Sequence, residues 1–162
     1  MTGKVLVAGI GNIFLGDDGF GVEVAQRLAA VALPDHVKVV DFGIRSLHLA
    51  YELLDGYGAL ILVDTIGLGD EPPGTVVLVE PEIDWDAAVP FDAHTMNPDT
   101  VLASLRELGG DVGRLLLVGC QPATLEEGIG LSAPVAAAVD EAVRVVQELV
   151  GERAGVLEGR TP

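Results

Sequence analysis

The sequence predicts an α/β protein, a three-layer α/β/α sandwich around a mostly parallel, twisted sheet of about five strands. Short uninterrupted apolar runs at residues 5–8, 59–63 and 115–118 are typical of strands that helices cover on both faces. Between them lie longer segments whose apolar residues recur at helical spacing. Hydrophobic residues make up 49% of the chain and aromatic residues only 4%, so the expected core is aliphatic, which suits helices packed on a parallel sheet.

Strands and helices are expected to alternate along the chain in the order β-α-β-α-β-β-α-β-α, with glycines ending most helices. A short connection leads into the strand at residues 75–79, which could therefore run antiparallel at an edge. The expected strands are residues 5–8, 37–41, 59–63, 75–79 and 115–118, and the expected helices are residues 22–33, 47–54, 97–108 and, capped by Ser132, 133–150. Residues 1–150 are expected to form a single α/β domain, and residues 151–162 a flexible C-terminal tail.

The chain is organised around a glycine-rich turn at residues 9–21, which joins the first strand to the first helix. Phe14 occupies the position of the third glycine in a dinucleotide-binding fingerprint. Asp17 and Asp18 follow Gly16, where a phosphate-binding loop would carry Lys and then Ser or Thr. Two carboxylates would repel a phosphate, so the turn is expected to serve a cation. The simpler alternative is that Asp17 or Asp18 caps the helix.

Acidic and imidazole side chains are expected to meet at the carboxyl edge of the sheet. Asp17 and Asp18 follow the first strand, and Asp64 ends the third. His94 closes the long irregular loop at residues 80–93, just before a helix that should begin at the same edge. Two carboxylates and an imidazole suit a divalent ion such as Zn, Ni, Co or Mn with open positions, which favours metal-assisted hydrolysis. In the simpler alternatives, Asp64 caps a turn and His94 is a solvated loop residue.

A phosphoacceptor receiver domain is the alternative from another class. It also places an acidic pair after its first strand and an aspartate after its third, and it binds Mg²⁺. It requires a lysine near the end of the last strand, where this chain has Cys120-Gln121-Pro122, so this alternative is disfavoured. Cys120 follows an apolar strand and has no base nearby in sequence, and it is expected to be a buried thiol and not a nucleophile.

Charge and hydropathy exclude several classes of partner. The formal net charge of -16 would repel nucleic acid and anionic lipid. No apolar run approaches the roughly 20 residues of a membrane span, and the N-terminus lacks the pattern of a secretion signal. A single cysteine rules out an internal disulfide and fits a reducing compartment. We expect a cytoplasmic protein with no nucleic-acid partner and no membrane insertion.

Four motifs, taken in order, resemble those of the hydrogenase maturation proteases, endopeptidases that process the large subunit of nickel-iron hydrogenases. The resemblance extends from about residue 5 to residue 150. The motifs are Gly9-Ile10-Gly11-Asn12 with Gly16-Asp17-Asp18-Gly19-Phe20-Gly21, Val63-Asp64, Ala93-His94, and Gly128-Ile129-Gly130-Leu131-Ser132. Two positions depart from the family pattern: Asp41 is retained but is followed by Phe42-Gly43-Ile44-Arg45 where Gly-Gly-Thr is common, and Gln121 stands where many relatives carry Glu.

The resemblance implies a function and a set of site residues. Asp18, Asp64 and His94 would contact a metal, while Asp17 and Asp41 are candidates for the general base or for positioning. The enzyme would remove the C-terminal extension of a hydrogenase large-subunit precursor after nickel insertion. Nickel would be supplied by the substrate, although another divalent metal could occupy the site, and a monomer is favoured. The alternative is a non-catalytic nickel-sensing chaperone that binds the same precursor.

Overall fold

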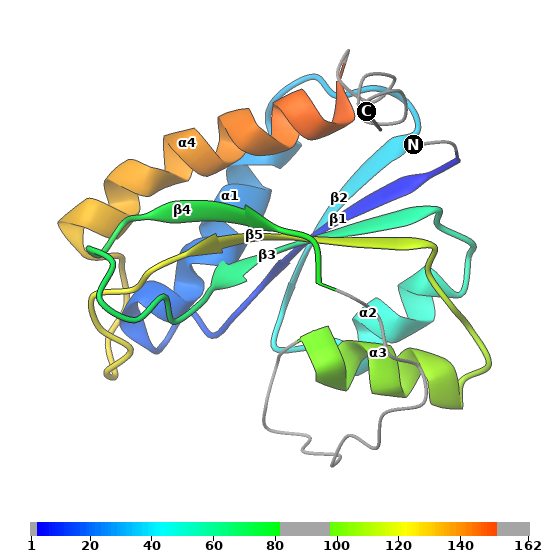
Figure 1. The fold of residues 1–162 in the computed structure, drawn as a ribbon, viewed down its shortest axis with the longest axis horizontal. Helices are drawn as coiled ribbons and strands as arrows, with labels where there is room; N and C mark the ends of the chain where they lie inside the picture. The colour runs from blue at the N-terminus through cyan, green and yellow to red at the C-terminus, as the bar shows by residue number, and fades with distance from the viewer. Residues whose placement is uncertain (1–2, 82–97, 152–162) are drawn as a thin grey trace.

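The computed structural model describes residues 3–81 and 98–151, in which helices cover both faces of a five-stranded sheet (Figure 1). The strands are β1 (Val5–Ile10), β2 (Val37–Gly43), β3 (Ala59–Thr65), β4 (Val76–Val79) and β5 (Arg114–Cys120). The helices are α1 (Phe20–Ala29), preceded by the 3-10 turn η1 (Gly16–Gly19), α2 (Ser46–Leu53), α3 (Pro98–Glu107) and α4 (Ala133–Val150). The predicted fold class and element order are confirmed.

The strand order is β2-β1-β3-β5-β4. β2, β1, β3 and β5 run parallel, and β4 pairs antiparallel with β5 at one edge, as the short connection before β4 predicts. Every residue of β1 is buried, as are all but the last of β3 and all but the first of β5. This burial explains their uninterrupted apolar runs, since helices cover both faces of these central strands.

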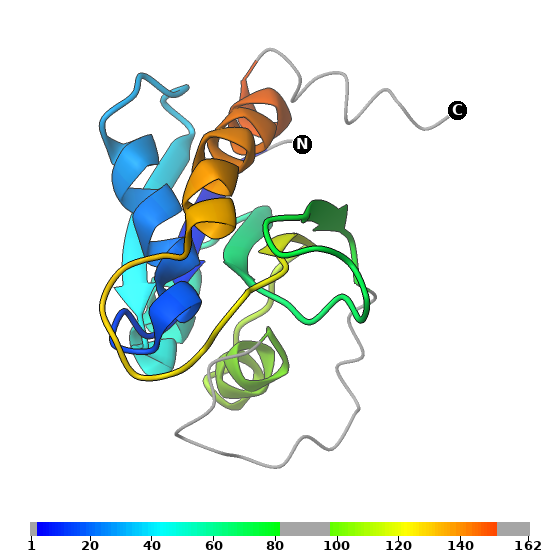
Figure 2. The ribbon, with the colours of Figure 1, turned by 90° about the vertical axis from the view of Figure 1, so that its left-hand side faces the viewer.

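Successive residues of each central strand point to opposite faces of the sheet and so enter two separate cores. Val5 and Val7 pack with α1 and α4 on one face, and Leu6 and Ala8 pack with α2 and α3 on the other. The view turned by 90° shows α1 and α4 side by side on their face of the sheet (Figure 2). Among the described residues, no helix is long and apolar enough to cross a bilayer.

Two glycines let the turn after β1 pack against its neighbours at distances that no side chain would allow. A Cβ on Gly21 would lie 2.0 Å from the carbonyl oxygen of Val63 in β3. Gly11 has a φ of +134°, and a Cβ there would lie 1.9 Å from the carbonyl oxygen of Asp18. Glycine is therefore required at both positions to draw the turn, and Asp18 with it, against the end of β3.

The ends of β1 and β3 form the switch point of the sheet. The chain passes from β1 through α1 to β2 on one side, while β3 pairs with β5 on the other side. Ligands of open α/β sheets bind in the crevice outside the carboxyl ends of strands at such a point. The turn that carries Asp18 and the strand end that carries Asp64 both lie there.

Candidate active site

Asp18 spans the gap between the turn after β1 and the end of β3. Its Oδ2 accepts a hydrogen bond of 2.7 Å from the backbone N–H of Asn12. Its Oδ1 accepts one of 3.3 Å from the hydroxyl of Thr65. The residue is half-buried, so its carboxylate is fixed by protein donors and still within reach of solvent.

Asp64 lies at the end of β3 and is 8% exposed. Its Oδ1 accepts a hydrogen bond of 2.8 Å from the backbone N–H of Thr65. Burial, with a further contribution from the negative charge of Asp18, raises the pKa of Asp64 to about 8. The carboxylate of Asp18 is thus close enough to oppose the ionisation of Asp64, and each of the two side chains accepts a hydrogen bond from Thr65.

No basic side chain that the structure describes neutralises the charge of this pair of carboxylates. Within residues 3–81 and 98–151, neither Asp18 nor Asp64 forms an ion pair with a lysine, arginine or histidine. Two close, partly desolvated carboxylates without a countercharge can share a proton or bind a cation. The arrangement is therefore suited to receive positive charge.

Asp17 is fully buried, and its carboxylate binds the loop between β5 and α4. Its Oδ1 accepts a hydrogen bond of 2.7 Å from the Ser132 N–H, and its Oδ2 accepts one of 2.9 Å from the Ser132 hydroxyl. The N–H groups of Ala123 and Thr124 donate to Oδ2 at 2.8 and 3.1 Å. Burial alone would raise the pKa of Asp17, but these hydrogen bonds outweigh it and leave the pKa lowered. Asp17 is an ionised carboxylate whose acceptor positions are occupied by protein donors.

The hydrogen bonds of Asp17 correct two predictions about helix caps. Gly19 occupies the N-cap position of α1 and no side chain caps that helix, so the capping alternative for Asp17 and Asp18 is wrong. Ser132 does occupy the N-cap position of α4, but its hydroxyl makes no capping bond. It donates instead to Asp17, because a buried carboxylate accepts a stronger, charge-assisted hydrogen bond.

Backbone hydrogen bonds extend this contact into a seam between the turn and the loop at residues 123–132. The N–H of Gly16 donates to the Gly128 carbonyl at 2.8 Å, and the N–H of Gly128 donates to the Phe14 carbonyl at 2.9 Å. The N–H of Asp17 donates to the carbonyl of Thr124 at 3.0 Å. These hydrogen bonds therefore join residues more than 100 positions apart in sequence beside the site. Figure 2 shows the yellow loop passing next to the blue turn.

Asp41 lies near the end of β2, where its backbone pairs with Gly9 of β1. Its side chain accepts one long hydrogen bond, of 3.4 Å, from the Gln26 amide. It lines a pocket of about 360 Å³ together with the turn residues Gly11 and Asn12. Asp41 is half-buried and open to this pocket, in contrast to Asp17.

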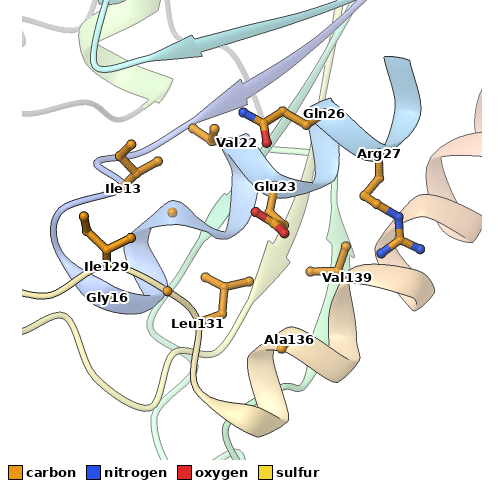
Figure 3. Close-up of a pocket in the computed structure, with 12 residues that line it drawn as sticks. Ile13, Gly16, Val22, Glu23, Gln26, Arg27, Ile129, Leu131, Ala136 and Val139 are labelled. Atoms are coloured by element: carbon orange, nitrogen blue, oxygen red, sulfur yellow. The ribbon is translucent and has the colours of Figure 1, made fainter. Parts of the chain in front are cut away.

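A second pocket, of about 460 Å³, lies between α1 and α4 and is called the α1–α4 pocket below (Figure 3). It shares Ile13, Val22 and Gln26 with the pocket at Asp41. Its complete lining is Ile13, Gly16, Gly19, Val22, Glu23, Gln26, Arg27, Ile129, Gly130, Leu131, Ala136 and Val139. The two pockets therefore adjoin at Ile13 of the turn and at Val22 and Gln26 of α1.

Cys120 and Gln121, at the end of β5, have structural roles. Cys120 is fully buried and burial raises the pKa of its thiol to about 11, which supports its assignment as an unreactive thiol. The Gln121 side chain accepts a hydrogen bond of 2.5 Å from the backbone N–H of Leu68. Gln121 thus holds the loop before β4, a task that requires no charge.

Comparison with known proteins identifies the family. A family model described as hydrogenase maturation protease matches residues 22–149. The chain belongs to the hydrogenase maturation protease family. It is 34% identical over 162 residues to the hydrogenase expression/formation protein HupD of Rhodobacter capsulatus, covering 98% of this chain and 77% of that protein. It is 32% identical to the hydrogenase 2 maturation protease of Escherichia coli, covering 88% of both. The solved hydrogenase maturating endopeptidase HYBD of E. coli superposes with a TM-score of 0.71 at 30% identity, covering 88% and 89% of the two chains.

This hydrogenase maturation endopeptidase brings together two of the three residues predicted to contact a metal. Asp18 and Asp64 meet through Thr65. His94 lies outside the described residues, so its position relative to them stays a prediction. Among the described residues, no group of three or more His, Cys, Asp and Glu side chains is arranged to hold a metal ion.

Sequence reasoning missed two residues of the protease that organise its site. Thr65 directly follows Asp64, and a hydroxyl beside a strand-end aspartate was a signal that could have been used. Ser132 was expected to cap α4, and nothing local indicated that it would bind Asp17. Its true partner lies 115 positions away in sequence.

Proposed function

We propose that this endopeptidase removes the C-terminal extension of a nickel-iron hydrogenase large-subunit precursor after nickel has been inserted. The observation that carries the proposal is the pair Asp18 and Asp64 at the switch point of the sheet, joined through Thr65. Nickel is carried by the substrate and binds where these carboxylates lie.

The donor chemistry of the site fits such a recognition step. Carboxylate oxygens together with the imidazole of His94 would offer a divalent ion an incomplete set of ligands. An incomplete set binds a free ion weakly, but it binds well once the substrate brings further ligands. The raised pKa of Asp64 supports the proposal, because bound positive charge would relieve the repulsion between Asp64 and Asp18. Cleavage would then follow only when nickel is in place.

Hydrolysis of a peptide bond also needs a base that takes a proton from the attacking water. Asp17 is poorly suited to this task, because it is fully buried and its oxygens accept four hydrogen bonds. Among the described residues the Asp41 side chain accepts only the long hydrogen bond from Gln26, and it lines a pocket together with Asn12, which in turn donates to Asp18. Of the two candidates, the geometry favours Asp41 for the base and Asp17 for positioning.

The test is incubation of the purified protein with nickel-loaded and nickel-free precursor, followed by mass analysis of the precursor C-terminus. We expect loss of the extension only from the nickel-loaded form. Asp18→Asn, Asp64→Asn and His94→Ala should each abolish cleavage. Asp70→Asn and His48→Ala are matched controls, since both residues are exposed and neither lines the two pockets beside the site. Cleavage that persists in the first three variants would overturn the site assignment, and a stable complex without cleavage would indicate the chaperone alternative.

A further inference from the structure

The α1–α4 pocket is lined by apolar side chains that come from both sides of the seam. From the turn and α1 come Ile13 and Val22, and from the loop and α4 come Ile129, Leu131, Ala136 and Val139. Ile13 and Ile129 are 44% and 78% exposed, so large apolar groups are presented to solvent at this site. At about 460 Å³ the pocket is within the size range of ligand sites and has room for an apolar side chain.

The walls of the pocket are held in place without a ligand. Gly16 and Gly19 belong to one wall, and Gly130 belongs to the other. Asp17, between those two glycines, binds Ser132 of the opposite side through two hydrogen bonds. A pocket whose walls are fixed in advance loses little conformational entropy when it is filled.

The pocket also carries a negative charge. Glu23 lines it, and its carboxylate lies among the apolar side chains in Figure 3. Within the described part of the chain, Glu23 has no ion-pair partner, whereas Arg27 at the same pocket is neutralised by Asp140. An occupant with a basic group therefore complements the pocket, and one with a carboxylate does not.

We propose that the α1–α4 pocket is a docking site for the large-subunit precursor and takes an apolar side chain that has a basic residue beside it. The inference rests on the proposed function, because the precursor is the polypeptide that must lie against Asp18. The α1–α4 pocket adjoins the pocket at Asp41 through shared lining residues, and Asn12 of that second pocket donates to Asp18, so a precursor segment held at Asp18 lies beside both pockets. The acidic surface, with a formal net charge of -16, favours the same basic segment during encounter.

Two alanines of α4 offer a matched test of the apolar part of the pocket. Ala136 and Ala137 are both exposed, but only Ala136 lines the pocket. Ala136→Phe fills the pocket, and Ala137→Phe adds the same side chain outside it. We expect Ala136→Phe to raise KM for nickel-loaded precursor at least about tenfold with kcat nearly unchanged, a loss of about 1.4 kcal/mol of binding free energy. Ala137→Phe should match the wild type, and both variants should unfold at the wild-type temperature.

The role of the negative charge of Glu23 is tested by Glu23→Lys. The control is Glu148→Lys, which makes the same change of charge at an exposed position of α4. We expect Glu23→Lys to raise KM several-fold and Glu148→Lys to have little effect. If the wild type cleaves the precursor while Ala136→Phe equals Ala137→Phe, the docking site is wrong and the proposed function stands. If the wild type neither binds nor cleaves the precursor, the proposed function itself fails.

Discussion

Asp17 and Ser132 are joined by two hydrogen bonds, from the Ser132 N–H to Oδ1 at 2.7 Å and from the Ser132 hydroxyl to Oδ2 at 2.9 Å. The pair links the turn after β1 to the start of α4. It also places a carboxylate at the N-terminus of an 18-residue helix, where the helix dipole favours negative charge. The structural role of Asp17 follows from this pairing, and it leaves Asp18 as the member of the acidic pair that faces the candidate active site.

Asp17→Asn should destabilise the protein, because one carboxylate oxygen becomes an NH₂ group that faces N–H and O–H donors. Losing charge-assisted hydrogen bonds and leaving buried donors unpaired costs roughly 2–4 kcal/mol. For a chain of this size each kcal/mol lowers the melting temperature by roughly 2–4 °C. Thermal unfolding at pH 7 measures the loss. Ser132→Ala removes one hydrogen bond and should cost about 1 kcal/mol. An Asp17→Asn variant as stable as the wild type would contradict the anchoring role.

Asp64→Asn, unlike Asp17→Asn, should stabilise the protein at neutral and alkaline pH. The pKa of Asp64 is raised to about 8 in the folded protein from 3.8, so folding favours the protonated form. Its contribution to stability is complete below pH 3.8 and is lost as the pH rises through about 8. Between these values the wild type should lose up to about 1.4 kcal/mol per pH unit relative to the variant.

Melting temperatures of the wild type and Asp64→Asn at pH 5, 7 and 9 check this prediction. The melting temperature of Asp64→Asn relative to the wild type should increase with pH and level off above about pH 8. Asp70→Asn, at an exposed position, should show no such trend. A constant difference between the wild type and Asp64→Asn across this range would mean that Asp64 does not titrate near 8.

The convergence of Asp18 and Asp64 could be predicted from sequence because it depends on local patterns. Uninterrupted apolar runs identify the parallel strands, and the carboxyl ends of such strands share one edge. The role of Asp17 could not be predicted in this way. Its partners lie in the loop at residues 123–132, which has no periodicity, and only the folded chain brings that loop to the turn. The same limit applies to Ser132, whose capping position was predicted correctly while its hydrogen bond was not.

A divalent cation should stabilise the protein in a pH-dependent way if Asp18 and Asp64 bind it. A ligand that binds only the folded state stabilises the protein. The gain in unfolding free energy grows with the logarithm of the ratio of ligand concentration to dissociation constant. Protons compete with the cation for Asp64 below about pH 8. Millimolar Ni²⁺ should therefore raise the melting temperature more at pH 8 than at pH 6. The increase should vanish in Asp18→Asn and persist in Asp70→Asn; an equal increase in both variants would place the cation elsewhere.

Gly21→Ala should disrupt the packing that carries Asp18 to β3. The added Cβ would lie 2.0 Å from the Val63 carbonyl oxygen, a backbone atom that cannot move aside without distorting β3. Overpacking of this kind costs typically 1–3 kcal/mol and more when the backbone must shift. Gly67→Ala is the matched control, since nothing lies within 4 Å of a Cβ there and the change should be neutral or slightly stabilising. Denaturant unfolding of both variants measures the difference. Equal stabilities of the two variants would show that α1 can move away from β3 without a loss of stability. The close packing of Gly21 would then not be what positions Asp18.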